Sequence, residues 1–297
     1  MSQLTYVVVT AARNEADYIG LTLDSMVAQT ARPLRWMIVS DGSTDGTDEL
    51  IAKYAAIYPW ITLIHVGDRN ERHFAGKVHS FNQGYERLRD VQYDVIASLD
   101  ADISFDAGYF EFLLERLSHE PRIGVVGTPF QEASGESYDY RFVSIEHVSG
   151  ACQVFRRACF EAIGGYRPIK TGSIDHVAVI TARMQGWKTR SYRDKVCVHH
   201  RPIGTAQASV VRARFKYGMK DYAIGNSPLW QIFRSAYQVT RPPYVLGGAA
   251  LAFGYLWAWL RRAERCVPPD LVAFHRREQF FRLKQRLFRS STSSALA

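Results

Sequence analysis

Val95-Ile-Ala-Ser-Leu-Asp-Ala-Asp102 is the stretch that decides the fold of this 297-residue chain. Val95–Leu99 is a short apolar run of the kind that forms a buried strand, and two carboxylates follow it at once. Residues two apart in an extended segment point the same way, so Asp100 and Asp102 face one place. Because two like charges this close repel each other, the pair indicates a bound cation, and carboxylate oxygens suit Mg²⁺ or Mn²⁺. The alternative interpretation is a solvated loop after a strand, since Asp-x-Asp is common.

Short apolar runs and longer amphipathic segments alternate on both sides of this stretch. The predicted strands are Thr5–Thr10, Trp36–Asp41, Ile61–Val66, Asp94–Leu99 and Ile123–Thr128. The predicted helices between them are Asp17–Gln29, Asp45–Ile57, Val78–Arg89 and Ala107–Ser118. This alternation predicts an α/β fold with a parallel sheet covered on both faces. Further on, Gly150–Phe155 is a predicted strand and Ile174–Gln185 a predicted helix.

Polar clusters follow three of the predicted strands at their carboxyl ends, where ligands bind to open α/β sheets. They are Ala12–Glu15, Asp41–Asp45 and Asp100–Asp102. Asp41–Gly46 could pass for a calcium loop, but the twelfth position is Ala52, where a bidentate Glu is needed. A turn with a helix cap at Thr44 or Asp45 is the simpler interpretation.

Other motifs are weaker when each is taken alone. Gly76-Lys77 resembles the end of a phosphate loop, but Val78 replaces the required Ser or Thr, and no Gly-x-Gly-x-x-Gly occurs. Asp175 opens a predicted helix, where an acidic residue more often stabilises the helix dipole than performs catalysis. His199 and His200 follow a short strand, and a pair of histidines more often fills structural roles than binds metal.

The charge of the chain is unevenly distributed. Lys and Arg number 37 and Asp and Glu 29, a formal net charge of +8. Residues 1–200 hold 21 basic and 25 acidic residues, whereas residues 201–297 hold 16 basic and 4 acidic ones. Such asymmetry indicates an anionic partner for the basic part, either nucleic acid or an anionic membrane. The four cysteines are too few for a disulfide scaffold, and the amino terminus resembles no secretory signal, so we expect a cytosolic protein.

The basic part of the chain also carries an apolar segment. Thr205–Ile224, Pro228–Val239 and Asp270–Arg289 are predicted helices, and Pro243–Leu260 holds 18 residues without a charge. That run is slightly short of the ~20 residues that a spanning helix needs, and basic residues flank both of its ends. An interfacial or re-entrant helix on an anionic membrane is therefore expected, with a buried core helix as the alternative. Nucleic-acid binding is not expected, because the basic residues accompany an apolar segment.

Seven motifs, taken together and in this order, resemble those of the family 2 glycosyltransferases, which are inverting nucleotide-sugar enzymes of the GT-A fold. They are Val8–Glu15, Val39–Asp45, Gly76-Lys77 with Asn82-Gln83-Gly84, Leu99–Asp102, Gly150–Arg156 leading to Gly164-Gly165-Tyr166, Asp175 with Gly186-Trp187, and His199. The likeness covers Thr5–Arg201, about two thirds of the chain. It implies a Rossmann-like mixed sheet with helices on both faces. The basic and apolar helices that follow this part are expected to form a carboxyl-terminal, membrane-associating extension.

The resemblance also implies roles for individual residues. The nucleotide-sugar would be bound by Thr10, Ala12, Arg13, Glu15, Asp41, Lys77, Asp100 and Ala101. Asp102 would be the main protein ligand of the Mg²⁺ or Mn²⁺ ion, completed by His199 or His200. Asp175 would be the catalytic base, although many members have Glu at the preceding position, which here is Ile174.

These observations predict a metal-dependent inverting glycosyltransferase domain in residues 1–204 and a membrane-associating extension in residues 205–297. The expected donor is a nucleoside-diphosphate sugar, and the expected acceptor is a hydroxyl of a saccharide, lipid-linked, as in bacterial polysaccharide pathways. The expected location is the cytoplasmic face of the inner membrane. One alternative is an inactive membrane partner subunit, which the intact Asp102 and Asp175 argue against. Another is a nucleotidyltransferase, but Ala11–Glu15 is not the glycine-rich loop of that class.

Overall fold

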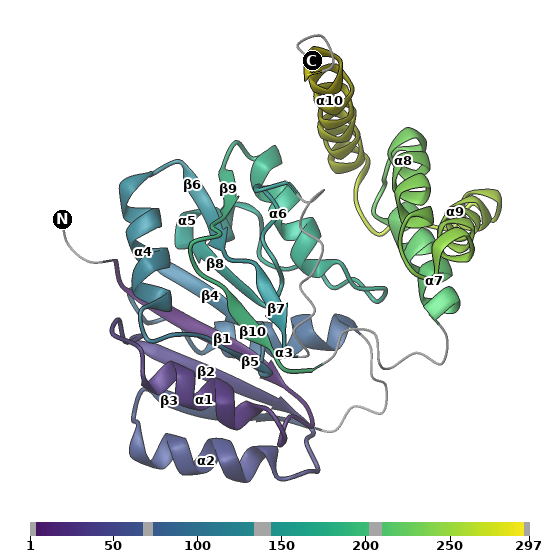
Figure 1. Ribbon diagram of the computed structural model, residues 1–297. Helices are drawn as coiled ribbons and strands as arrows, with labels where there is room; N and C mark the ends of the chain where they lie inside the picture. The colour runs from purple at the N-terminus through teal and green to yellow at the C-terminus, as the bar shows by residue number, and fades with distance from the viewer. Residues whose placement is uncertain (1–3, 68–73, 134–143, 202–209, 294–297) are drawn as a thin grey trace. The chain divides into compact units, whose positions relative to one another are not determined.

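The chain divides by its internal contacts into two units, Met1–Ile203 (unit 1) and Gly204–Ala297 (unit 2) (Figure 1). The computed structural model describes residues 4–67, 74–133, 144–201 and 210–293. The predicted domain boundary between residues 204 and 205 lies outside the described residues. The interpretation of the two parts as transferase and membrane-associating extension stays a prediction.

A seven-stranded mixed sheet in the order β3-β2-β1-β4-β8-β6-β9 lies at the centre of unit 1. Its strands are β1 (Tyr6–Ala12), β2 (Arg35–Asp41), β3 (Ile61–Val66), β4 (Val95–Leu99), β6 (Ile123–Gly127), β8 (Cys152–Arg156) and β9 (Lys188–Ser191). The pairs β3–β2, β2–β1 and β1–β4 are parallel, and β8 runs antiparallel to both β4 and β6. The ends of β1, β2 and β4 therefore meet at one edge, as the sequence predicted.

Helices cover both faces of this sheet (Figure 1). They are α1 (Ile19–Val27), α2 (Thr47–Ile57), α3 (Phe74–Glu86), α4 (Tyr109–His119), α5 (Arg157–Ala162) and α6 (Ile174–Met184). Alternation along β1 divides its side chains between the faces: Tyr6 and Val8 join a core with residues of α1 and α4, and Val9 faces α3. The predicted α/β class, with a mixed sheet between helices, is confirmed.

Helix α3 lies unusually close to the sheet because it carries Gly84. A Cβ atom at Gly84 would lie 2.7 Å from a methyl group of Val9 and 3.0 Å from one of Val39. Only glycine permits this approach at the observed position. The close packing fixes the helix on the sheet, and its first turn then carries Gly76 and Lys77.

A second, three-stranded sheet consists of β5 (Ile103–Ser104), β10 (Cys197–His199) and β7 (Phe130–Glu132), in that order. In its antiparallel register His199 pairs with Ile103, the residue that follows Asp102. Residues almost a hundred positions apart are thereby brought side by side. This pairing was not predicted, because strands of two or three residues carry no periodic pattern.

Unit 2 consists of helices in its described part. They are α7 (Val210–Ala223), α8 (Pro228–Val239), α9 (Tyr244–Leu260) and α10 (Pro269–Ser293). Helices α7 and α9 cross at glycines, since a Cβ at Gly254 would lie 2.0 Å from the carbonyl oxygen of Phe215. Residues 205–209 of the predicted first helix lie outside the described residues. Among the described helices, none is both long enough and apolar enough to cross a membrane.

Candidate active site

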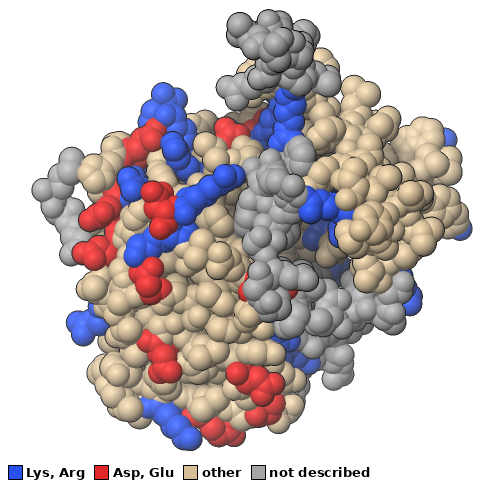
Figure 2. Space-filling model, viewed as in Figure 1, with Lys and Arg blue, Asp and Glu red and all other residues tan. Residues whose placement is uncertain are grey.

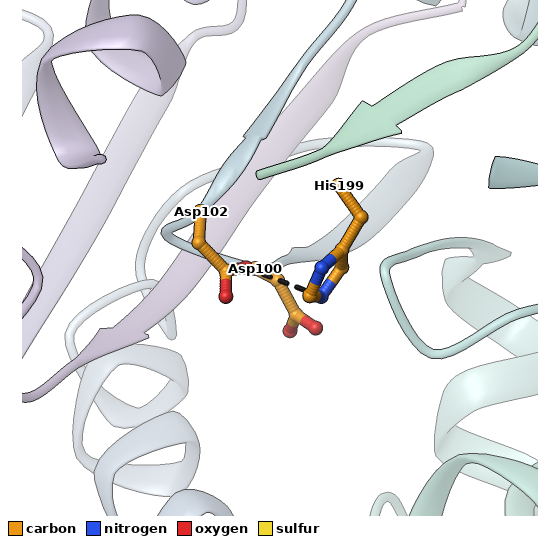
Figure 3. A group of neighbouring side chains, drawn as sticks. All are labelled: Asp100, Asp102 and His199. Atoms are coloured by element: carbon orange, nitrogen blue, oxygen red, sulfur yellow. Dashed lines mark ion pairs between the residues drawn. The ribbon is translucent and has the colours of Figure 1, made fainter. Parts of the chain in front are cut away.

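Asp100, Asp102 and His199 come together at the carboxyl end of β4 (Figure 3). Each offers one ligand atom, and the three atoms lie within 4.8 Å of one another. The two carboxylates come from the β4–β5 connection, and the imidazole comes from β10. His199 Nε2 lies 3.6 Å from Asp102 Oδ1, and both side chains are largely buried. Two carboxylates and an imidazole form a donor set that suits Mn²⁺ or Mg²⁺.

The imidazole of His199 is oriented by the backbone. Its Nδ1 lies 2.6 Å from the carbonyl oxygen of Arg201, which can only accept a hydrogen bond, so Nδ1 carries the proton. In the neutral ring this leaves the lone pair of Nε2 directed at the carboxylates. A lone pair facing a carboxylate is repulsive unless a cation lies between them, and this arrangement is typical of metal-binding histidines.

His200 is turned away from this group. Its Nε2 is 2.8 Å from the hydroxyl of Ser104, and its backbone N–H donates to the carbonyl oxygen of Asp102 at 2.9 Å. Loss of hydration lowers the pKa of His200, although the charge of Asp102 acts in the opposite direction. The sequence left His199 and His200 as alternatives, and the structure brings only His199 into the group of ligand atoms.

Lys77, from the first turn of α3, forms an ion pair with Asp100. Burial raises the pKa of Asp100; the Lys77 ammonium lowers it, and the Asp102 carboxylate raises it further. Loss of hydration lowers the pKa of Lys77, but its ion pair with Asp100 and the charges of Asp175 and Asp102 together raise the pKa above its ordinary value. Lys77 therefore carries a full positive charge next to the carboxylate pair.

Arg201 connects several parts of the site, and the sequence assigned no role to it. Its guanidinium forms an ion pair with Glu15 and donates to the carbonyl oxygen of Asn14 at 3.2 Å. Its Nε lies 3.5 Å from Asp102 Oδ2. Burial raises the pKa of Glu15 to about 7, with Asp102 adding to the rise and Arg201 opposing it. The only signal in the sequence was the position of this arginine directly after the two histidines.

Asp41 is the last residue of β2 and lies beside Gly76, in the first turn of α3. Its Oδ2 is 3.8 Å from Arg13 Nη1, and a Cβ at Gly76 would lie 3.4 Å from the same oxygen. Its second oxygen, Oδ1, is buried and has no hydrogen-bond partner among the described residues. A buried carboxylate oxygen without a partner is costly, and an N–H or O–H group of a ligand would satisfy it.

Three of the residues assigned to nucleotide-sugar binding have their side chains in the core. Thr10 is fully buried, and its hydroxyl accepts a hydrogen bond from the indole of Trp36 at 2.9 Å. Ala12 and Ala101 belong to the hydrophobic core cluster. These side chains cannot reach a ligand, because alternation along the chain turns them inward, and only backbone groups are left for binding at these positions.

The loops after β1 and β2 support each other. Asn14 adopts a left-handed backbone with φ of 54°, and its amide oxygen accepts from Thr44 N at 2.9 Å. The Asp45 carboxylate accepts from Ala16 N at 3.0 Å and from Thr47 N at 3.1 Å. The predicted helix cap at Thr44 or Asp45 is wrong, since α2 begins at Thr47 with Gly46 at the N-cap position. Asp45 instead joins the two loops, and this holds Arg13 and Glu15 at the edge of the sheet.

Asp175 lies in the first turn of α6 and packs against the backbone of Gly150. A Cβ at Gly150 would lie 2.9 Å from Asp175 Oδ2. The backbone of Asp175 is held by Gln153, whose amide donates to its carbonyl oxygen at 3.2 Å, and Gln153 in turn accepts from the hydroxyl of Tyr166 at 2.8 Å. The side chain of Asp175 accepts no hydrogen bond from the described residues, and its charge acts on Lys77. Asp175 is therefore close enough to Lys77 for its charge to act there, and the N-cap position of α6 belongs to Ser173 instead.

Residues 7–147 match the model of the family described as "Glycosyl transferase family 2". The chain carries a glycosyl transferase family 2 domain. The matched range ends before Asp175 and His199, and the structure brings His199 to Asp100 and Asp102, which lie within that range.

Relatives of the domain include synthases and transferases. The chain is 33% identical over 120 residues to the poly-β-1,6-N-acetyl-D-glucosamine synthase of Staphylococcus aureus strain MSSA476, which is 40% of this chain and 27% of the synthase. It is also 33% identical over 98 residues to the 4,4'-diaponeurosporenoate glycosyltransferase of Staphylococcus aureus strain USA300, which is 33% of this chain and 24% of that protein. The chain thus matches about a quarter of the length of these curated relatives.

Solved structures share the fold over more of the chain. The mannosyltransferase PcManGT of Pyrobaculum calidifontis, in complex with GDP-Man and Mn²⁺, superposes with a TM-score of 0.59 and 18% identity, covering 100% of this chain and 82% of that one. TarS 1-349 of Staphylococcus aureus, in complex with UDP-GlcNAc, superposes with a TM-score of 0.54 and 14% identity, covering 80% of this chain and 71% of that one. At these identities the likeness shows the fold, which is of the GT-A type.

Proposed function

We propose that unit 1 is a metal-dependent inverting glycosyltransferase that moves a sugar from a nucleoside diphosphate to a hydroxyl of a saccharide acceptor. One observation carries this proposal: Asp100, Asp102 and His199 converge at the sheet edge of a family 2 domain. Lys77 pairs with Asp100 of this group, Asp41 lies beside Gly76 next to Lys77, and the charge of Asp175 acts on Lys77. A nucleotidyltransferase is not favoured by any of these contacts.

A divalent cation fits the residues that are present. Asp102 and His199 would hold it, with Asp100 beside them, because the neutral ring of His199 would offer the lone pair of Nε2 next to the two carboxylates. When bound, such an ion neutralises charge on a diphosphate leaving group and acts as a Lewis acid. PcManGT, a structural neighbour, is solved with Mn²⁺. Mn²⁺ or Mg²⁺ is therefore the proposed cofactor.

The donor would be bound by groups on both sides of the carboxylate pair. Asp41 offers a buried oxygen without a partner, which supports hydrogen bonding to a base or ribose. Arg13 and Lys77 offer positive charge, Lys77 near the carboxylates and Arg13 near Asp41. Negative charge builds on the diphosphate as the glycosidic bond breaks, and an ammonium next to it stabilises that charge. Structural neighbours are solved with GDP-Man and with UDP-GlcNAc, so both kinds of nucleotide are candidates.

The base in this proposal is Asp175. The acceptor oxygen forms a bond to the anomeric carbon, its proton passes to the Asp175 carboxylate, and the diphosphate leaves with the electrons of the broken C–O bond. One displacement through an oxocarbenium-like transition state inverts the anomeric centre. The free carboxylate of Asp175, which accepts no hydrogen bond from the described residues, is suited to accept a proton.

The test of this function is a screen of UDP-, GDP- and dTDP-sugars with the full chain and Mn²⁺. We expect slow release of sugar from one of these donors, dependence on Mn²⁺ that EDTA abolishes, and transfer to a saccharide acceptor with an inverted anomeric configuration by NMR. Hydrolysis of none of the donors, with none of them bound, would favour the inactive partner subunit. A product with retained configuration would contradict the role of Asp175.

We further propose that transfer takes place at the cytoplasmic face of the membrane and that the acceptor is lipid-linked. Two features of unit 2 support this. Its residues 204–297 hold 15 basic and 4 acidic residues, a net charge of +11 that favours an anionic surface. Its helix α9 has no charged residue over its 17 positions. An enzyme held on a bilayer meets acceptors that are themselves anchored there.

The location and the acceptor are tested separately from the chemistry. After cell fractionation we expect the full-length chain in the membrane fraction and, in protease protection, accessible from the cytoplasmic side. We also expect a polyprenyl-diphosphate saccharide to be a better acceptor than the same saccharide without its lipid. Equal rates on both acceptors, or recovery of the chain only in the soluble fraction, would contradict this part of the proposal and leave the transferase assignment standing.

A further inference from the structure

Helix α8 buries polar side chains and exposes aliphatic ones, while its aromatic side chains, Trp230, Phe233 and Tyr237, are half-buried. Its buried residues are Gln231, Ser235 and Gln238, which recur at helical spacing along one face. Its exposed residues include Leu229, Ile232 and Val239, and Ile232 is 66% exposed. In a helix on the surface of a water-soluble protein the apolar stripe faces the core and the polar face meets water. The pattern of α8 is the reverse.

Helix α9 repeats this pattern in another form. Its buried face is made largely of small residues: Gly247, Gly248, Gly254 and Ala258, with Leu251 and Tyr255. Its large apolar side chains point outward: Val245, Leu246, Phe253, Leu256, Trp257, Trp259 and Leu260 are all exposed. Small residues at helix contacts and large apolar residues facing outward are typical of helices packed within lipid, where close backbone approach holds the helices together.

The interior of unit 2 is correspondingly polar. Asp221 is buried and forms an ion pair with Arg234, whose Nη1 is 2.5 Å from its Oδ1. Asn226, His275 and Gln279 are all buried and lie within hydrogen-bond distance of one another, each contact being 2.8 Å. Tyr255 donates from its hydroxyl to the Asn226 carbonyl oxygen at 2.7 Å. Such a network connects the helices without a large apolar core.

Water is a poor solvent for this arrangement. The exposed side chains of α8 and α9 are neighbours along each helix, and an apolar surface that is contiguous marks a binding face. In Figure 2 the part of the surface over α8 and α9 is almost free of charge, with Lys and Arg at its margins. Arg261 and Arg262 directly follow α9, and Arg241 lies between α8 and α9. An uncharged face with basic residues at its margin matches a bilayer, whose apolar layer is bordered by phosphates.

A second copy of the chain is a less suitable occupant of this face. Two copies joined there would bring together two units that each carry a net charge of +11. That like-charge repulsion opposes association, whereas the same charges favour lipid phosphates. A lipid bilayer is the one occupant that complements both the apolar face and its basic margin.

We propose that the outward faces of α8 and α9 enter the hydrocarbon layer of a bilayer from one side, with Arg241, Arg261 and Arg262 at the level of the headgroups. This inference rests on the proposed function and specifies how the chain would bind the membrane. It adds that burial of apolar side chains in hydrocarbon, and not charge, is the main source of binding. The geometry agrees with insertion from one side, because no described helix is suited to crossing.

Vesicle binding by the full-length chain distinguishes insertion from surface attraction. We expect binding to vesicles of phosphatidylcholine alone, and binding that persists when salt is raised from about 0.1 M to about 1 M, where the Debye length falls to roughly 3 Å. Brominated lipid chains should quench the fluorescence of Trp257 and Trp259, which are exposed on α9. Replacing both by Phe should remove most of that quenching, because Trp36 and Trp60 are buried in unit 1 and Trp187 also belongs to unit 1. The residual quenching would come from Trp230, which is half-buried on α8.

Matched variants identify the face. The triple change Ile232→Asn, Leu246→Asn and Leu260→Asn should weaken binding to neutral vesicles by about 100-fold or more, since three large apolar side chains no longer enter the hydrocarbon layer. The control is Leu21→Asn, Leu34→Asn and Ile57→Asn, which changes three exposed apolar side chains of unit 1 and should leave binding within about two-fold. Unchanged donor hydrolysis and melting temperature show that each variant is folded.

Several results would overturn the inference. Binding that requires anionic lipid and disappears at high salt would contradict insertion, while leaving the membrane location of the proposed function intact. Failure to bind any vesicle would contradict both. A stable dimer in ultracentrifugation that the α8–α9 triple variant converts to a monomer, with no vesicle binding, would identify a second copy as the occupant. Equal binding by the triple variant and the wild type would show that this face is not the one that meets lipid.

Discussion

Units 1 and 2 distribute their large apolar side chains in opposite ways. Among the described residues, 20 large hydrophobic side chains are exposed; 4 lie in unit 1 and 16 in unit 2, which is less than a third of the chain. Unit 1 buries Val7, Val8 and Val9 completely. Unit 2 buries Gln231, Gln238 and His275. The difference indicates that the two units are adapted to different surroundings.

The contrast extends to charge. In unit 1 the carboxylates that come close together, Asp100 and Asp102, are brought there by a buried strand and a short sheet. In unit 2 basic residues flank the apolar helix α9 along the chain. A site that holds a cation and a diphosphate needs a rigid sheet edge, whereas a surface that meets lipid needs exposed apolar groups. Chemistry is thus expected to depend on unit 1 and membrane binding on unit 2, and variants can separate the two.

The largest effect is expected from Asp102→Ala. Loss of the main ligand of the cation should abolish transfer and Mn²⁺-dependent nucleotide binding, and vesicle binding by unit 2 should stay unchanged. Asp106→Ala, which removes a nearby carboxylate paired with Lys195, is the matched control and should keep near-normal turnover. Turnover and Mn²⁺ dependence are measured at saturating donor. Near-normal turnover of Asp102→Ala would remove the basis of the metal assignment.

Asp175→Asn should lower transfer by about 10²–10⁴-fold, because it removes a proton acceptor and keeps the shape of the side chain. The affinity for the donor with Mn²⁺, measured by calorimetry, should stay within a few-fold of the wild type. A variant that turns over nearly as fast as the wild type would show that another residue is the base. Retained donor binding with lost transfer would sharpen the assignment, since binding and chemistry would then be separate within unit 1.

The sequence was sufficient to predict six of the seven strands of the large sheet, most helices and the proximity of the two carboxylates. Buried strands such as Val95–Leu99 have a strong apolar signal, and the polar residues after them mark the ligand edge. It could not predict that β10 pairs with β5, because that pairing depends on contacts between residues almost a hundred positions apart. The choice between His199 and His200 depends on this pairing, since it alone fixes which imidazole faces Asp102.

In both units the sequence predicted the secondary structure better than the direction in which individual side chains point. The periodicity of Pro228–Val239 predicted a helix correctly, but periodicity gives no sign of which face is inside. The side chain of Thr10 was assigned to the nucleoside by resemblance, and its burial against Trp36 depends on the packing of β1 and β2. The role of Arg201 was missed because the contacts with Glu15 and Asp102 are distant in sequence.

Arg201→Ala should weaken binding of the nucleoside diphosphate by about ten-fold in the presence of Mn²⁺. The change removes the guanidinium that pairs with the largely buried carboxylate of Glu15 and lies beside Asp102. Arg157→Ala is the matched control, because Arg157 has a similar exposure, one acidic partner and one aromatic neighbour away from the site. Calorimetry with UDP and GDP gives the affinities. Equal affinity in Arg201→Ala and the wild type would mean that the contacts of this arginine with Asn14 and Glu15 do not support donor binding.

A smaller effect is expected from Gly150→Ala. The added Cβ would meet the Asp175 carboxylate at 2.9 Å, so the base must shift, and we expect turnover to fall about five- to ten-fold with unchanged donor affinity. Gly20→Ala in α1 is the control, since a Cβ there meets nothing within 4 Å. A fall in donor affinity that matches the fall in turnover would point to a general disturbance of unit 1 instead of displacement of the base.

The central claim is that the Asp100, Asp102 and His199 group of unit 1 holds a divalent cation needed for nucleotide binding. The most direct test is a calorimetric titration of the full-length chain with UDP and with GDP, first with Mn²⁺ and then, in the same preparation, with EDTA. We predict binding of at least one nucleotide with Mn²⁺ and a loss of at least about ten-fold in affinity with EDTA. Equal affinity in Mn²⁺ and EDTA, or no binding of either nucleotide, would contradict it.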